Sequence, residues 1–251
     1  MAPIAFQLMS DLHLETHPTY DFDIKLTAPY LALLGDIGHL LKRYWVVFFL
    51  LGNHEPTYQT WQIAKDRVRA FEQRMSRLRS TSTIGKFVFL DQTRYDVTDT
   101  LTVLGCTLFT HEREVGERMV DFKGIREWTV EDHNEAHRSD VEWLNSQVAA
   151  ITATEPKREI VIFTHHCPTK DARALDPRFL DSPVSTGFVC DMRGEVCWQR
   201  EAVVCWGFGH THYSCDFVDE HGTRVVANQK GYYTSQESKY AIKKIFMVGR
   251  E

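Results

Sequence analysis

Short runs of apolar residues recur along the chain, and each stops abruptly at a glycine or a polar residue. The run at 46–51 is apolar at all six positions, and four of these residues are β-branched or aromatic. This composition predicts a strand that is buried on both faces, as strands of a parallel sheet are. Similar runs lie at 4–9, 30–34, 160–163 and 202–208. We therefore expect an α/β fold in which these segments are strands.

Two segments carry the spacing of amphipathic helices. Residues 60–79 place apolar side chains at three- and four-residue intervals, which predicts a helix that packs on the sheet and exposes an arginine-rich face. Residues 129–132 open a second helix with a capping-box pattern. Its expected apolar stripe is Val130, Ala136, Val141, Leu144 and Val148. His133 and His137 lie one turn apart on this helix, and without a third ligand nearby we expect them on its solvated face rather than in a metal site.

Weaker patterns predict the remaining elements. Residues 168–200 contain three prolines and two glycines and no clear period, so we expect a long loop that forms a lid or a substrate wall. Residues 219–222 have the composition of a hairpin turn. Further strands are expected at 86–90, 95–98, 101–109, 214–218, 223–227 and 242–248.

One connection is short for the fold that these strands imply. Only residues 37–45 separate the strand at 30–34 from the next one. A crossover between parallel strands normally takes a dozen or more residues. Residues 37–39 resemble the start of a loop, and 42–44 resemble the basic end of a helix. We therefore expect that residues are missing from this connection.

Composition restricts the class of protein. The 251 residues are 43% hydrophobic and 25% charged, which fits one domain spanning residues 1–251. The formal charge of −5 argues against broad nucleic-acid binding. The sequence shows neither a membrane span nor a secretory signal, so we expect a cytoplasmic protein. Six cysteines without Cys-x-x-Cys spacing predict reduced thiols, including Cys190 and Cys197. The oligomeric state is not predicted.

Residues of types that bind metals follow the ends of five apolar runs, at 4–9, 30–34, 46–51, 160–163 and 202–208. In a parallel sheet the carboxyl ends of the strands meet along one edge, where ligands bind. Taken alone, Gly52-Asn53-His54 is also typical of an ordinary turn. The other four runs end similarly, however, and carry five of the twelve histidines. The polar groups are Ser10-Asp11-Leu12-His13, Gly35-Asp36, Gly52-Asn53-His54-Glu55, Thr164-His165-His166 and Gly209-His210-Thr211-His212. Imidazole, carboxylate and amide donors suit Zn, Mn or Fe, and the lack of thiolates argues against a structural zinc site of the cysteine type.

In this order, the five motifs resemble the calcineurin-like metallophosphoesterase superfamily, over residues 4 to 235. The resemblance implies a four-layer α-β-β-α sandwich with a dinuclear centre of divalent or trivalent Mn, Fe or Zn ions at the carboxyl ends of the strands. The resemblance implies that Asp36 bridges the two ions, because the family places its bridging aspartate directly after the second strand and Asp36 is the only acidic residue there. The resemblance implies the ligands Asp11, His13 and His212 for the first ion, and Asn53, His165 and His210 for the second.

The same resemblance implies catalytic roles for His54, Asp36 and Asn53, with His54 as general acid. Glu55 could orient His54 through its other ring nitrogen. His166 remains an alternative to His165 as a ligand, because successive residues at a strand end point to opposite faces. His111 also follows a predicted strand, but the family pattern has no ligand there, and we expect it at the rim.

The residues after Asp36 narrow the class of substrate. Serine/threonine protein phosphatases of this superfamily continue with Asp-Arg-Gly, whereas this chain has Ile37-Gly38-His39. We therefore expect hydrolysis of a phosphodiester, or of another small phosphate ester, by a bridging water that attacks phosphorus in line. The alternatives are a phosphomonoesterase, a serine/threonine protein phosphatase, and a metal-binding scaffold without turnover.

Overall fold

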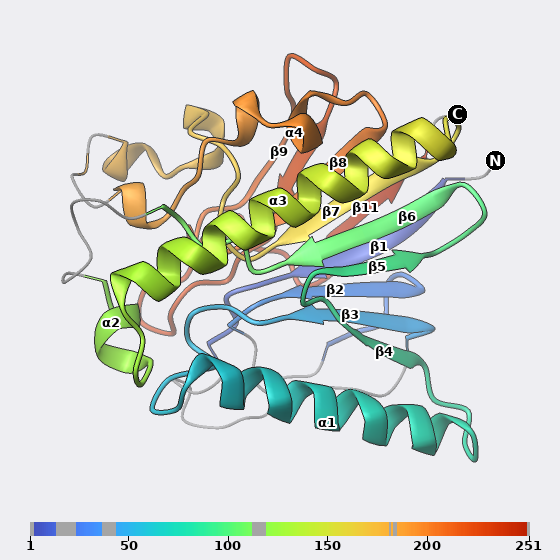
Figure 1. The fold of residues 1–251 in the computed structure, drawn as a ribbon, viewed down its shortest axis with the longest axis horizontal. Helices are drawn as coiled ribbons and strands as arrows, with labels where there is room; N and C mark the ends of the chain where they lie inside the picture. The colour runs from blue at the N-terminus through green and yellow to red at the C-terminus, as the bar shows by residue number, and fades with distance from the viewer. Residues whose placement is uncertain are drawn as a thin grey trace.

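The computed structural model describes residues 3–13, 24–36, 44–111, 119–180, 182 and 185–249. Two sheets pack face to face, and one long helix lies against the outer face of each sheet (Figure 1). The molecule is therefore an α/β sandwich with four layers in the order α-β-β-α, as the sequence predicts. None of the helices in the described ranges is long and apolar enough to cross a bilayer.

The first sheet has five strands in the order β11-β1-β2-β3-β4. They are β1 (Ile4–Met9), β2 (Tyr30–Leu34), β3 (Val46–Leu50), β4 (Lys86–Phe89) and β11 (Ile245–Val248). The first four run parallel, and β11 pairs antiparallel with β1. Every residue of β3 is buried, which explains why that strand is apolar at every position.

The second sheet has six strands in the order β5-β6-β7-β8-β10-β9. They are β5 (Thr93–Asp96), β6 (Leu101–Cys106), β7 (Glu159–Thr164), β8 (Val203–Phe208), β9 (Cys215–Val218) and β10 (Arg224–Ala227). Strands β6, β7, β8 and β10 run parallel, with β5 and β9 antiparallel at the two edges. The carboxyl ends of the parallel strands therefore lie along one edge of this sheet.

Three apolar clusters hold the layers together. Side chains of both sheets form the middle cluster, in which Phe6 lies between Phe163, at 5.8 Å, and Phe246, at 5.5 Å between ring centroids. The helix α1 (Trp61–Arg79) covers the outer face of the first sheet, and α3 (Val130–Thr154) covers the second. All six cysteines are free, as predicted.

The two long helices begin where their capping residues predict. The Thr60 side chain accepts a hydrogen bond from the backbone of Ile63 at 3.2 Å. Thr129 and Asp132 form the predicted reciprocal capping box. Short helical turns occur in the described part of 168–200, which was expected to be a loop, and a further turn lies just before α3. They are α2 (Asp121–Gly124), η3 (Ala172–Ala174), η4 (Pro177–Phe179), η5 (Ser185–Gly187), η6 (Met192–Gly194) and α4 (Val196–Gln199).

Some predicted boundaries are wrong. Strand β5 begins at Thr93 rather than at residue 95, because pairing with β6 fixes its register. The predicted strand 101–109 ends at Cys106, and β11 begins at Ile245 rather than at residue 242. Strands β2 and β3 do pair in parallel. Residues 37–43 of their connection lie outside the described ranges, so the expectation of missing residues stays untested.

The buried face of α3 also differs from its predicted stripe. Val130 is 38% exposed, whereas His133 is wholly buried rather than solvated. The His133 ring packs against Phe109 and Trp128, with centroids 4.7 and 6.3 Å away, and its Nε2 lies 3.3 Å from the Thr110 hydroxyl. Burial lowers the pKa of His133 to about 4, so this histidine is neutral at pH 7. The aromatic cover comes partly from a segment without a regular pattern, which is why the sequence does not reveal it.

Candidate metal centre

Five of the predicted ligands have a left-handed backbone, which is uncommon for residues other than glycine. The φ angles are 53° at Asp11, 46° at His13, 55° at Asp36, 71° at His210 and 50° at His212. Neighbouring turns brace this backbone: the N–H of Asp11 donates to Gly35 O at 3.1 Å, and that of His13 donates to Asp36 O at 2.9 Å. Such strain gathers at functional sites and persists only where the surrounding structure fixes it.

Two glycines allow the strand ends to approach each other. A Cβ atom on Gly52 would lie 2.2 Å from Oδ1 of Asp36, and one on Gly35 would lie 2.3 Å from Nδ1 of His165. Gly35 also has a φ of +86°, which strains any other residue. These positions therefore accept only glycine if Asp36 and His165 are to keep their places.

One group of candidate ligands joins β1 to the turn after β8. Nε2 of His13 lies 3.0 Å from Nε2 of His212, which in turn lies 3.4 Å from Oδ1 of Asp11. One ligand atom from each of these residues lies within 4.8 Å of the other two. Both carboxylate oxygens of Asp11 also accept the backbone N–H of His210, each at 3.0 Å. That contact holds the turn after β8 against the end of β1.

A second group joins β2, β3 and β7. Nε2 of His165 lies 3.1 Å from Oδ1 of Asn53 and 3.5 Å from Oδ2 of Asp36. His210 completes a set with Asp36 and His165, whose ligand atoms lie within 4.8 Å of one another. Nδ1 of His165 lies 2.8 Å from the carbonyl of Leu34, so Nδ1 carries the hydrogen and donates it. Nε2 then directs its lone pair into the group, as a metal-binding histidine does.

Asp36 stands between the two groups. Its Oδ2 lies 3.7 Å from Nε2 of His13 in the first group and 3.5 Å from Nε2 of His165 in the second. Its Oδ1 accepts the backbone N–H of His54 at 3.1 Å. His13, Asp36 and His54 form a third set within the same 4.8 Å limit. The position of Asp36 suits a shared ligand, and its side chain is 1% exposed.

The protonation states of these residues fit metal ions. Burial lowers the pKa of His165 and of His210, so both rings are neutral and their lone pairs are free at pH 7. Burial opposes ionisation of Asp11, but the hydrogen bond from His212 and the nearby histidines together hold its pKa below the usual range. Carboxylate, amide and neutral imidazole acceptors therefore face one another in a buried space. Cations such as Zn, Mn or Fe suit this donor set.

Tyr232, which the sequence analysis did not single out, lies beside His54. Its hydroxyl is 3.1 Å from Nε2 of His54, and its ring centroid is 4.3 Å from that of His13. Glu55, expected to orient His54, accepts the backbone N–H of Gly52 at 2.7 Å. Tyr232 follows β10, whose carboxyl end lies beside that of β8. The strand-end rule, applied to β10, would have pointed to this segment.

Three further described histidines have different environments. His166 is wholly buried with its ring 4.1 Å from that of His210, and both of its nitrogens lack a hydrogen-bond partner among the described residues. It belongs to none of the close ligand sets found there, whereas His165 does. His111 is exposed and belongs to none of them either. His137 is half-buried, with Nδ1 hydrogen-bonded to the carbonyl of Phe109, so it is not on a solvated face.

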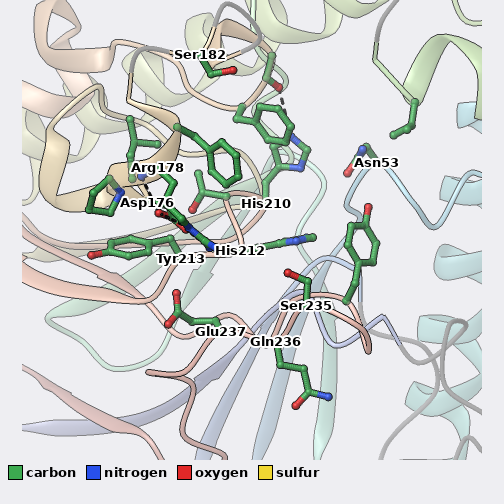
Figure 2. A pocket seen from close by; sticks show the side chains of 18 of the residues that line it. Asn53, Asp176, Arg178, Ser182, His210, His212, Tyr213, Ser235, Gln236 and Glu237 are labelled. Atoms are coloured by element: carbon green, nitrogen blue, oxygen red, sulfur yellow. Dashed lines mark hydrogen bonds and ion pairs between the residues drawn. The ribbon is translucent and has the colours of Figure 1, made fainter.

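A cleft of about 900 Å³ opens beside the candidate ligands. Asn53, His210 and His212 line it, and Figure 2 shows Asp176 and Arg178 farther from Asn53 than His210 is. Residues 175–179, 182, 187 and 188 of the segment 168–200 line it, and the role of this segment as a lid or substrate wall stays a prediction. A cleft of this volume is in the range of sites for small organic ligands.

Comparisons with known proteins show the fold. No protein-family model matches the chain, and no curated protein matches it significantly. The crystal structure of the phosphopantetheinyl hydrolase PptH from Mycobacterium tuberculosis matches with a TM-score of 0.64 at 15% identity, covering 92% of this chain and 90% of that one. A dimetal phosphatase from Danio rerio matches with a TM-score of 0.46 at 12% identity, covering 92% and 88%. The chain therefore shares the fold of the phosphopantetheinyl hydrolase structure.

Proposed function

We propose that this protein is a metal-dependent phosphoester hydrolase of the calcineurin-like metallophosphoesterase superfamily. The observation that carries the proposal is the convergence of two ligand groups on Asp36, at the strand ends of a metallophosphoesterase-like fold. A buried cluster of carboxylates and neutral imidazoles that only stabilised the fold would leave these acceptors facing one another, which is unfavourable without a cation.

The ligand assignment follows the two groups. Asp11, His13 and His212 would hold one ion, and Asn53, His165 and His210 would hold the other. Asp36 would contact both, because its Oδ2 lies within 3.7 Å of a histidine nitrogen from each group. When bound, two such ions supply a nucleophilic water at neutral pH and stabilise charge on the phosphate.

His54 is assigned as the general acid. It follows Asn53 directly and lines the cleft, so its ring can reach an oxygen that leaves toward the cleft. As the P–O bond breaks, the departing oxygen keeps the electron pair and takes the proton of His54. The Tyr232 hydroxyl, at 3.1 Å from Nε2, holds the ring in place between turnovers. Tyr232 is thus a positioning residue in this proposal.

We assign phosphodiesters or small phosphate esters as substrates. The chain lacks the Asp-Arg-Gly segment that follows the Gly-Asp motif in serine/threonine protein phosphatases. The cleft is large enough for an organic group attached to the phosphate. The similar structure named as a phosphopantetheinyl hydrolase supports hydrolysis of a phosphoester.

A substrate panel tests this proposal. Protein reconstituted separately with Mn, Fe or Zn is assayed against bis-nitrophenyl phosphate, nitrophenyl phosphate and a phosphopeptide. We expect the highest kcat/KM for the diester. The largest kcat/KM for the phosphopeptide would overturn the assignment of substrate class. Bound metal without turnover of any ester would favour a metal-binding scaffold.

A further inference from the structure

Exposed apolar side chains from three segments line the cleft. Val120 is 55% exposed, Phe179 is 59% exposed and Phe188 is 40% exposed, and all three line the cleft. They come from separate parts of the chain, before α2, in η4 and after η5. Single exposed apolar residues are ordinary on a protein surface, but a group of them beside a polar site marks a place where an apolar partner binds.

The apolar lining of the cleft includes a residue that contacts the candidate metal centre. The Phe188 ring stacks on that of His210, with centroids 5.0 Å apart and an angle of 27° between the planes. Leu175 and Pro177 extend the apolar lining toward Phe179. A group bonded to a phosphate at the metal centre would therefore meet apolar surface from its first atoms onward.

The charged residues of the cleft already have partners in the protein. The guanidinium of Arg178 donates to both carboxylate oxygens of Asp176, at 3.1 and 2.9 Å from its Nε. The ammonium of Lys239 donates to the Tyr213 hydroxyl at 2.7 Å and lies 4.2 Å from the centroid of that ring. Among the described residues that line the cleft, three carboxylates (Asp121, Asp176 and Glu237) outnumber these two cations, so the lining carries no net positive charge to attract a second phosphate or a carboxylate.

Polar groups line the cleft as well. Ser235, Gln236 and Glu237 lie together there, on the far side of His212 from Ser182 in the view of Figure 2. Their side chains can meet hydrogen-bonding atoms of a ligand, while the apolar side chains meet its carbon atoms. An elongated group with both kinds of atoms fits this lining better than a sugar, which exposes hydroxyls on all sides.

We propose that the cleft binds the non-phosphate arm of the substrate, and that this arm is an elongated, mainly aliphatic chain lying against Phe179 and Val120. The inference rests on the proposed phosphoester hydrolysis and specifies the substrate class for it. It identifies a specificity site that is separate from the metal ligands.

A series of diesters with one variable arm tests the proposal. The substrates are the methyl, butyl and octyl esters of nitrophenyl phosphate, each used below its micelle concentration with Mn-loaded protein. Burying a methylene group against an apolar wall should raise kcat/KM by about two- to fourfold. The butyl ester should therefore exceed the methyl ester by roughly tenfold or more.

Variants locate the arm in this cleft. Phe179→Ala should reduce the ratio of kcat/KM for the butyl ester to that for the methyl ester, because Phe179 touches the longer arm. Val120→Ala should have a smaller effect of the same kind. Val218→Ala is the matched control: Val218 is also 55% exposed, but it lies on β9 and outside the cleft lining. This control should keep the full dependence on chain length.

A second measurement separates this inference from the proposed activity. Binding of methyl-, butyl- and octylphosphonate to the Mn-loaded protein is followed by calorimetry, which needs no turnover. Affinity that rises with chain length in wild type, and less so in Phe179→Ala, supports the arm site even if no ester is hydrolysed. Hydrolysis of the diesters without any dependence on chain length overturns the arm site and leaves the proposed activity standing. Equal chain-length dependence in Phe179→Ala and wild type also overturns it.

Discussion

Replacing Tyr232 by phenylalanine tests how His54 is held. The substitution removes one hydroxyl, the group 3.1 Å from Nε2 of His54, and leaves the ring that packs on His13. The backbone before it is fixed independently, because the N–H of Gly231 donates to Asp11 O at 2.9 Å. The variant should therefore fold and bind metal as the wild type does.

The expected magnitude follows from the single hydrogen bond. A hydrogen bond of this kind contributes about 0.5 to 1.5 kcal/mol. If the whole contribution serves to orient the acid, kcat should fall by about 2- to 12-fold. The loss should be larger for an alkoxide leaving group than for nitrophenolate, because nitrophenolate departs readily without a proton.

The assay compares kcat for an alkyl and a nitrophenyl leaving group in one preparation, with metal content measured alongside. Tyr233→Phe is the control, because Tyr233 is 49% exposed and does not line the cleft. Unchanged kcat on the alkyl ester would refute a positioning role for Tyr232. Equal losses on both esters, or loss of metal, would show that the residue supports the metal site instead.

Two further predictions concern groups inside the protein. His54→Ala should leave the metals bound and slow hydrolysis of alkyl esters by about 10²- to 10⁴-fold, with a smaller loss on nitrophenyl esters; lost metal would contradict its role as acid. Burial raises the pKa of Asp140 to about 6, above its unfolded value near 4. The protonated carboxyl therefore stabilises the folded protein below pH 4, and this contribution falls as the pH rises and is lost above pH 6. Relative to wild type, Asp140→Asn should thus gain up to about 3 kcal/mol in urea denaturation between pH 4 and pH 7, and a constant difference across that range would disprove the shift.

The parts of the fold that the sequence predicts well are those where burial alone determines the residue type. Every residue of β3 is buried, so its apolar run marks the strand almost to the residue. In edge strand β5, half-buried and exposed residues alternate instead. Its exposed Arg94 and Asp96 form an ion pair, and Arg94 also pairs with Glu155, just after α3. Its position depends on pairing with β6, which no local pattern records.

The candidate site also has residues that the sequence predicts and residues that it does not. The seven predicted ligands follow apolar strands, and the structure brings them together at one edge, while their roles stay a prediction. Tyr232 and the cleft wall come from irregular segments that meet only in the folded chain. The burial of His133 and Asp140 on α3 could not be predicted from the sequence. Polar residues that hydrogen-bond inside the protein look the same in a sequence as polar residues that face solvent.

The central claim is that Asp36 is a ligand shared by two metal ions. Elemental analysis of wild type and Asp36→Asn, purified and reconstituted in parallel, tests it most directly, with Asp140→Asn as a buried aspartate outside the ligand groups. We predict two metal ions per chain in wild type and in the Asp140→Asn control, and loss of both together in Asp36→Asn, with loss of diester hydrolysis. One ion retained at full stoichiometry in active Asp36→Asn would contradict the shared site.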